Sequence, residues 1–301
     1  MSSPASKPIA PLDLAALLLV AVVWGINNLA AKIALGYFPP LMTAGLRFAV
    51  VSAMLVAFVR PPPGAWRTLA LVGLATGVLH FGVQSIGLWM AKDLSPMVIA
   101  MQVWIPASVA FSSLFLHERA GPIRLAGMSI AFFGIVVLAI EPSVFGQLGA
   151  FVIVALASVV YGAIAIVVRR VPGVHPLTFQ AWIALCSWPV LFPLSALTEH
   201  GQIAAIQHGG LLPWAMILWG ALAGSVIGNA LMFAMVQRYE MARTTPYMFL
   251  SPLVGISLGI IVLHDPINPQ LALGAAITLA GVALVSLAEQ RFVTARTAPA
   301  E

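Results

Sequence analysis

Apolar residues along this chain gather into ten long runs, separated by short polar or proline-rich breaks such as Phe38-Pro39-Pro40. Each run is close to the ~20 residues that an α-helix needs to cross ~30 Å of hydrocarbon. The pattern therefore predicts an all-α membrane protein with ten transmembrane helices. They are expected at residues 12–35, 41–59, 66–90, 95–116, 122–140, 147–168, 177–199, 211–237, 243–263 and 270–288.

Composition supports a membrane protein and excludes several other classes. Of the 301 residues, 61% are hydrophobic and 8% are charged, against about 25% charged in a typical soluble domain. The net charge of +5 lies in short connections, so it gives no reason to expect a nucleic-acid partner. Cys186 is the only cysteine, which excludes disulfide frameworks and metal sites built from several cysteines. The first apolar run is too long for the core of a signal peptide and is interpreted as a span.

Basic residues at the ends of the runs predict the orientation, because cytoplasmic loops carry an excess of Lys and Arg. Only Lys32 and Lys92 would lie at outer ends if the N-terminus is inside, with Arg47 within a span. We therefore expect a multi-pass protein of the cell's inner (plasma) membrane with both termini in the cytoplasm. The inner ends would then carry Lys7, Arg60, Arg67, Arg119, Arg124, Arg169, Arg170, Arg238, Arg243, Arg291 and Arg296.

The chain contains an internal duplication at a fixed offset of 147 residues. Leu116-His117-Glu118 returns as Leu263-His264-Asp265, and the glycine pair 127 and 134 returns as 274 and 281. A looser match pairs Trp24-Gly25 with Tyr161-Gly162. We expect a first repeat over 1–142 and a second over 143–301. Five spans per repeat is an odd number, so the second repeat should enter the membrane inverted.

Inverted repeats predict alternating access around a central cavity near the middle of the membrane. Pro106 and Pro252 lie at nearly equivalent positions in the fourth and ninth runs. Each should interrupt its helix and free a backbone carbonyl one turn earlier, that of Gln102 in the first case. We interpret them as hinges beside the cavity, the alternative being tolerated kinks.

Polar and aromatic residues within the runs are the candidate substrate contacts, because the two copies differ at these positions; Met101 is added because it shares a helix face with Trp104. His80 and Gln84 share one helix face, and an imidazole inside a membrane usually marks an interior pathway. The alternative is a structural histidine bonded to a carbonyl, and each aromatic taken alone could equally belong to the core. The candidates are Asn27, His80, Gln84, Met101, Trp104, Tyr161, Asn229 and Tyr247.

Two cations and two glycine stripes complete the set. Lys32 and Arg47 are possible vestibule cations for anionic groups, although we expect Arg47 to extend toward the membrane surface. Gly73/Gly77 and Gly220/Gly224/Gly228 recur every four residues, which favours close packing of helix backbones. Ser225 lies inside the second stripe and is not interpreted as a nucleophile.

The inverted five-span repeats, Trp24-Gly25 in the first span and the "LHER" segment after the fourth resemble the drug/metabolite transporter superfamily, and within it the EamA family. His80 with Trp104 is further similar to the YddG-like amino-acid exporters. The resemblance covers essentially the whole chain and implies efflux of amino acids or related metabolites across the bacterial inner membrane. His264-Asp265-Pro266 departs from the pattern of the first copy, so no role is transferred to it.

We therefore expect a non-enzymatic, monomeric exporter of small amphipathic metabolites, with amino acids favoured. No Asp or Glu lies deep in a run, which favours facilitated transport over His80-dependent proton exchange. No cofactor, metal or nucleic acid is expected; the partners are a small-molecule substrate and the lipid bilayer. The alternatives are a carrier of phosphorylated or nucleotide-sugar anions, an intramembrane lipid-modifying enzyme and a channel.

Overall fold

A computed structural model of the chain describes residues 9–60, 62–117, 121–139, 146–171, 173–263, 269, 273–274, 276–285 and 287. Glu118 and Arg119 of the "LHER" segment and residues 264–266 of its second copy lie outside this part. Across the described residues the elements are helical, and no strand occurs among them.

Ten helical units match the ten predicted runs. Seven are long and apolar enough to cross a membrane, and three shorter apolar helices complete the set among the described residues. The second run differs, because its helix ends at Met54 and a short 3₁₀ turn, η2 (Val56–Phe58), follows.

The first five units are α1 (Pro11–Leu35), α2 (Pro40–Met54), α3–η3–α4 (Trp66–Leu74, Ala75–Gly82, Val83–Met90), α5–α6 (Leu94–Met101, Trp104–Leu116) and α7 (Pro122–Ala139). The second five begin with α9 (Leu148–Arg170) and α10 (Pro176–Thr198), which a short helix α11 (Gln202–His208) follows. They continue with α12–η4–α13 (Leu211–Trp219, Gly220–Asn229, Ala230–Arg238), α14–η5–α15–η6 (Met241–Thr244, Thr245–Phe249, Leu250–Leu258, Gly259–Leu263) and the helix Ala276–Val285.

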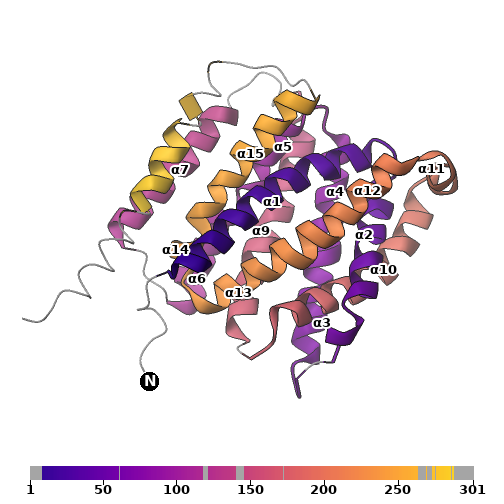
Figure 1. Ribbon diagram of the computed structural model, residues 1–301, viewed down its shortest axis with the longest axis horizontal. Coiled ribbons are helices and arrows are strands. Elements are labelled where there is room, and N and C mark those ends of the chain that lie inside the picture. Colours follow the sequence, from indigo (N-terminus) through magenta and orange to yellow (C-terminus); the bar gives the residue numbers. More distant parts are fainter. Residues whose placement is uncertain are drawn as a thin grey trace, which may run out of the picture.

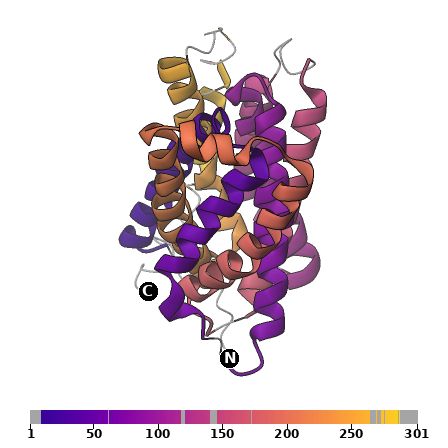
Figure 2. The same ribbon diagram turned by 90° about the vertical axis from the view of Figure 1, so that its right-hand side faces the viewer.

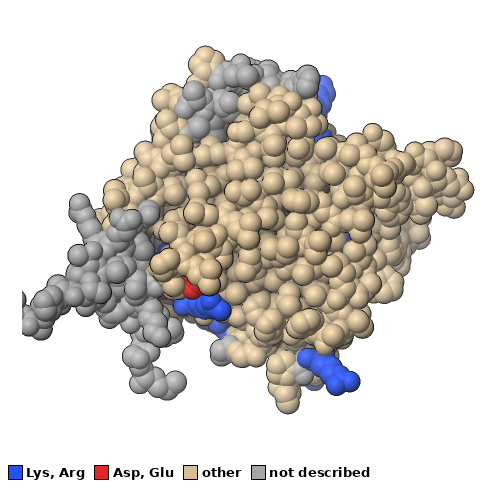
Figure 3. Space-filling model, in the orientation of Figure 1, with Lys and Arg blue, Asp and Glu red and all other residues tan. Residues whose placement is uncertain are grey.

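The outer surface of the bundle is suited to lipid. Most of one face is uncharged, and most of the Lys and Arg side chains visible on it lie near its margins (Figure 3). Large apolar side chains such as Leu79, Leu156 and Leu222 are exposed. A soluble protein would hide such a surface, whereas lipid tails solvate it at no cost.

The two repeats are inverted, as the contacts between their fifth helices show. A Cβ added at Gly127 of α7 would lie 2.9 Å from the carbonyl oxygen of Gly281, and one added at Gly134 would lie 2.8 Å from that of Gly274. Residue numbers thus rise along α7 as they fall along Ala276–Val285, so the two helices are antiparallel. Because Gly127 corresponds to Gly274 and Gly134 to Gly281, equivalent helices point in opposite directions.

The first span of each repeat also packs on the fourth span of the other repeat. α1 packs on α15, and α9 packs on α6; Figure 1 shows α1 running diagonally between α15 and α12, and Figure 2 shows the same bundle from the side. A Cβ at Gly25 would lie 2.8 Å from the carbonyl oxygen of Ser251, and one at Gly162 3.0 Å from that of Trp104. Gly25 corresponds to Gly162, and Ser251 corresponds to Trp104, so the two contacts are equivalent. The two repeats therefore interlock around one centre.

The helices nearest this centre depart from regular α-geometry at matching places. The π-helical segments η3 and η4 overlap at the 147-residue offset, and such segments often occur at functional sites. The fourth span turns at Gln102–Val103 before Pro106, and the ninth passes through 3₁₀ segment η5 before Pro252. The expectation of a free carbonyl at Gln102 is wrong, because the N–H of Ile105 donates to it at 3.0 Å in the tightened turn.

Candidate substrate-binding site

Three aromatic rings meet where the repeats interlock. Trp24 of α1 and Tyr161 of α9 occupy equivalent positions, and their ring centroids lie 6.0 Å apart. Trp104 of α6 lies 5.9 Å from Trp24 and 5.5 Å from Tyr161. All three pairs are edge-to-face, the arrangement that ring quadrupoles favour. The rings form a rigid apolar wall around the centre of the protein.

His80 of η3 lies against this wall. Its ring is 4.7 Å from that of Tyr161 and 4.5 Å from that of Phe81. Nδ1 lies 2.8 Å from the carbonyl oxygen of Ala157, and because a carbonyl only accepts, Nδ1 carries the proton. When the ring is neutral, Nε2 is therefore an acceptor. Both interpretations of the sequence apply to this residue, which bonds a carbonyl and also lines the cavity.

A cavity of about 60 Å³ lies beside the aromatic wall. One water needs about 10–15 Å³ on this measure, so the cavity holds only a few waters in this structure. Every predicted contact residue except Tyr247 lines it; Tyr247 is buried in η5. The lining residues are Trp24, Asn27, Asn28, Arg47, His80, Phe81, Gln84, Met101, Gln102, Trp104, Ser158, Tyr161, Asn229 and Ser251.

Several polar atoms of this lining are buried without a hydrogen-bond partner among the described residues. They are Asn27 Oδ1, Gln102 Oε1, Tyr161 Oη and Asn229 Nδ2. A buried polar atom left unpaired costs about 1–3 kcal/mol, and most such atoms in proteins are paired. The residues that line the cavity thus retain donors and acceptors that the described protein does not use.

Arg47 of α2 points into this cavity, so the expectation that it extends toward the membrane surface is wrong. Its Nε donates to Ser225 Oγ at 2.8 Å, and Ser225 Oγ donates to the carbonyl oxygen of Gly220 at 3.2 Å. The guanidinium lies 4.6 Å from the ring centroid of Phe81, within cation–π range. An ordered cation thus forms part of the central site.

Unlike Arg47, Lys32 lies outside the lining of the central cavity and caps a helix. Its Nζ donates to the carbonyl oxygens of Leu88 at 3.1 Å and Ala91 at 2.5 Å, capping the C-terminal end of α4. At the equivalent place in the second repeat, Arg169 donates to the carbonyl oxygens of Val236 and Tyr239 at the end of α13. Lys32 is not among the residues that line the central cavity. It does not join Arg47 in one cationic site.

The two glycine stripes differ in purpose. Gly73 meets the backbone of α10 at Trp182, which is the close helix packing that the sequence predicts. A Cβ at Gly224, however, would lie 2.7 Å from Asn27 Oδ1 and 3.4 Å from Arg47 Nη2, and one at Gly228 would lie 2.8 Å from Trp24 Nε1. The stripe in η4 therefore makes room for cavity side chains, which the packing interpretation missed.

Two further hollows lead from the cavity toward the α1–α2 loop. The first, of about 30 Å³, shares Asn27, Arg47 and Phe81 with the central cavity. It also shares Leu35 with a hollow of about 640 Å³ that opens between the α1–α2 loop and residues 198–201. Together they trace a narrow, interrupted route from the centre to one end of the bundle.

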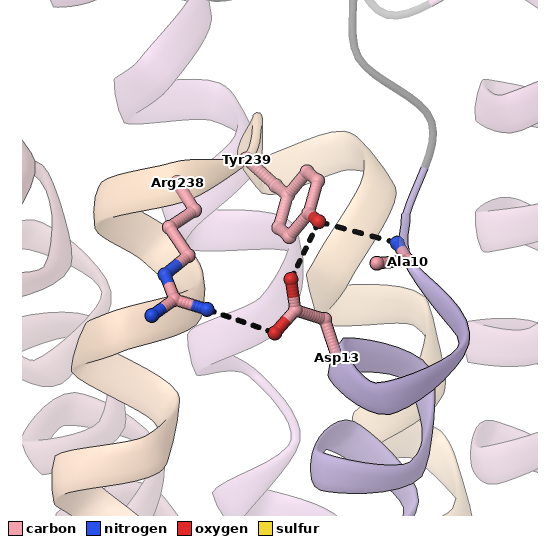
Figure 4. A network of polar contacts seen from close by, with 4 residues as sticks. All are labelled: Ala10, Asp13, Arg238 and Tyr239. Atoms are coloured by element: carbon pink, nitrogen blue, oxygen red, sulfur yellow. Dashed lines mark hydrogen bonds and ion pairs between the residues drawn. The ribbon is translucent and has the colours of Figure 1, made fainter.

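At the opposite end, the start of α1 is tied to the end of α13 (Figure 4). The phenol of Tyr239 donates to Asp13 Oδ2 at 2.6 Å and accepts from the N–H of Ala10 at 3.2 Å, while Arg238 pairs with Asp13 Oδ1 at 2.9 Å. Burial, and then the bond to Asp13, raise the pKa of Tyr239 above its usual value of 10.0. Asp13 lies about 28 Å along α1 from Lys32. Polar contacts therefore close this end of the bundle.

Comparison with known proteins agrees with this architecture. The EamA-like transporter family matches the chain twice, over residues 12–140 and 148–287. A "Probable amino-acid metabolite efflux pump" of Salmonella typhimurium is 29% identical over 278 residues, covering 88% of this chain and 91% of that protein. The protein of the same name from Escherichia coli is 28% identical over the same shares of both chains. A crystal structure with 18% identity superposes with a TM-score of 0.74 over 93% of this chain and 98% of the other, which shows a shared fold.

Proposed function

Because this chain belongs to the EamA-like transporter family, we propose that it exports small amphipathic metabolites through the central cavity, with aromatic and apolar amino acids as the favoured substrates. It would do so from the inner (plasma) membrane, with both termini in the cytoplasm. The observation that carries the proposal is the make-up of the cavity, where unpaired amide groups and the unpaired hydroxyl of Tyr161 accompany an aromatic wall at the junction of two inverted repeats. The names of the two relatives point to the same substrate class.

The lining residues divide the task of recognition between them. Trp24, Trp104 and Tyr161 provide flat surfaces for an apolar side chain. Asn27 Oδ1 and Asn229 Nδ2 provide an acceptor and a donor that nothing in the described protein uses. A ligand with one apolar and one polar end would satisfy both parts of the site.

Transport requires the cavity to widen, since about 60 Å³ is too small for an amino acid. The matched breaks before Pro106 and Pro252 would permit this by letting the outer parts of the fourth and ninth spans swing about the centre. Opening would proceed in turn toward the α1–α2 loop and toward the Tyr239 end. This is alternating access by two repeats that move in equivalent ways.

The proposed driving force is the substrate gradient. No Asp or Glu is among the residues that line the cavity, so the usual acidic proton relay has no candidate there. His80 is the one lining residue whose ordinary titration range lies near neutral pH. Proton exchange through His80 is accordingly the alternative mechanism.

Reconstituted protein tests the proposal. Proteoliposomes loaded with unlabelled L-phenylalanine should accumulate labelled L-phenylalanine by counterflow without any ion gradient. Trp104→Ala and Asn229→Ala should reduce this exchange, whereas Leu79→Ala on the lipid-facing surface should not. Flux that appears only with an imposed proton gradient would replace the facilitated mechanism with the His80 alternative, and absence of flux for every amino acid tested would overturn the proposed substrate class.

A further inference from the structure

Arg47 is a cation in the central cavity that has no carboxylate partner among the described residues. It lies seven residues after Pro40, about 10 Å into α2, and lines the cavity. Among the described residues no carboxylate pairs with it, and the Arg238–Asp13 ion pair lies away from it, at one end of the bundle. A buried charge without a counter-charge is costly, and a charge inside a membrane protein usually marks a substrate pathway. A partner for this cation is therefore expected.

The guanidinium is held so that its outer edge is available. Nε donates its hydrogen bond to Ser225 Oγ, and the Ser225 hydroxyl donates to the carbonyl oxygen of Gly220. The guanidinium carbon lies over the rings of Phe81 and Phe48, at 4.6 and 5.7 Å from their centroids. No described residue accepts a hydrogen bond from Nη1 or Nη2. These two nitrogens form a planar fork that fits the two oxygens of a carboxylate.

We propose that Arg47 is the carboxylate-binding residue of this site, and that the protein selects substrates bearing a carboxylate. The fork would donate two parallel hydrogen bonds to the carboxylate while Ser225 fixes its direction. The proposal rests on the proposed function and narrows its substrate class. For an amino acid, the neighbouring Asn27 Oδ1 offers an acceptor for the ammonium, since it approaches Gly224 from the same side as Arg47 Nη2.

The single cation favours a carboxylate over a phosphate. A phosphate monoester carries a charge of about −1.5 to −2 at neutral pH, so one guanidinium would leave net negative charge in the membrane. A second cation would have to come from Lys32, whose ammonium caps the end of α4. A carboxylate carries one charge and is neutralised by Arg47 alone.

The test compares matched ligands and matched variants. Binding of L-phenylalanine, L-phenylalaninamide, 3-phenylpropionate and phenyl phosphate is measured by thermal shift of the purified protein, and counterflow is measured in proteoliposomes. The variants are Arg47→Met and Arg47→Lys, with Arg67→Met as control, because Arg67 is an exposed arginine at the start of α3. Thermal unfolding without ligand shows whether each variant is folded.

We expect the wild type to bind L-phenylalanine about ten- to a hundred-fold more tightly than its amide, the range of a charge-assisted hydrogen bond. Arg47→Met should lose this preference, Arg47→Lys should keep part of it, and Arg67→Met should behave as the wild type. Equal binding of acid and amide by the wild type would overturn the role of Arg47 and leave amino-acid export standing. Binding of 3-phenylpropionate but of no amino acid, lost in Arg47→Met, would support Arg47 and overturn the proposed substrate. Preference for phenyl phosphate would overturn the choice of carboxylate.

Discussion

Gly224 shows how one missing side chain shapes the site. A methyl group there would lie 2.7 Å from Asn27 Oδ1 and 3.4 Å from Arg47 Nη2. Both are ends of side chains, so they can move aside without displacing a helix. We therefore expect Gly224→Ala to fold with a melting temperature close to that of the wild type, but to weaken L-phenylalanine binding by about ten-fold, the loss of one polar contact.

Gly149→Ala is the matched control, because nothing lies within 4 Å of a Cβ added at that helical glycine. It should leave binding unchanged in the same thermal-shift titration. If Gly224→Ala bound the ligand as well as Gly149→Ala does, the glycines of η4 would be needed only for packing.

The sequence could predict most residues of this site but not the direction of every side chain. Trp24, Asn27, His80 and Tyr161 stand out because an aromatic, amide or imidazole group is unusual inside a span. The direction of Arg47 was predicted wrongly because a long cationic side chain within a span commonly extends toward the membrane surface. Its actual direction depends on Ser225, a hydrogen-bond partner 178 residues away, which no local pattern reveals.

At the scale of the helices, the paired breaks before Pro106 and Pro252 carry the proposed motion. Replacing both prolines by alanine restores the N–H groups that a continuous helix needs. We expect the double variant to bind L-phenylalanine as the wild type does, while counterflow slows about ten-fold because the spans bend less readily. Initial rates of counterflow and thermal-shift affinities measure the two effects separately.

Pro189 provides the control for this pair. It also lies inside a helix, α10, but is exposed on the lipid-facing side. Pro189→Ala should leave the transport rate unchanged. Unaltered counterflow in the Pro106/Pro252 double variant would show that the breaks are static kinks.

The contact between α1 and α13 predicts a pH dependence. Below pH 10 the phenol of Tyr239 is protonated in both the folded and the unfolded chain. Since its pKa is raised in the folded state, the unfolded chain releases the proton first as the pH rises. The free energy of unfolding then falls from about pH 10 until the folded pKa is passed.

Tyr239→Phe lacks this titration and the hydrogen bond to Asp13. Its melting temperature should be below that of the wild type at pH 8, and the difference should shrink above pH 10. Tyr37→Phe, at an exposed tyrosine, is the control and should show no such convergence. A constant difference between wild type and Tyr239→Phe over pH 8–11 would show that the titration of this phenol does not contribute to the stability.

Helix positions were predictable from the long apolar runs, whereas departures from α-geometry were not. The spans 66–90 and 148–170 match predictions to within a few residues. The π-helical segments η3 and η4 have no proline or other local signal; their glycines, such as Gly77 and Gly224, permit close approach of neighbouring groups. The packing between spans decides such geometry, and packing is not visible in a single helix.

At the scale of the whole molecule, the repeat places related contacts at opposite ends. At one end Ala10 and Asp13, at the start of α1, bind Tyr239. At the other, Gln147, which precedes α9, accepts from the N–H of Lys92 at 2.6 Å and donates to Asp93 Oδ2 at 2.8 Å. By the offsets of the repeat, Ala10 corresponds to Gln147 and Tyr239 to Lys92. Both ties are made in this structure, in agreement with its small cavity.

Alternating access requires these two ties to open in turn, which predicts the outcome of cross-linking. In a Cys186→Ala background, cysteine pairs at Asp13/Arg238 and at Asp93/Gln147 can be joined by short reducible linkers. Either link alone should stop counterflow but preserve the thermal shift with L-phenylalanine, because the other end still opens. Both links together should abolish the shift as well. Counterflow that survives either single link would show that the tied end is not a gate, and the symmetric mechanism would fail with it.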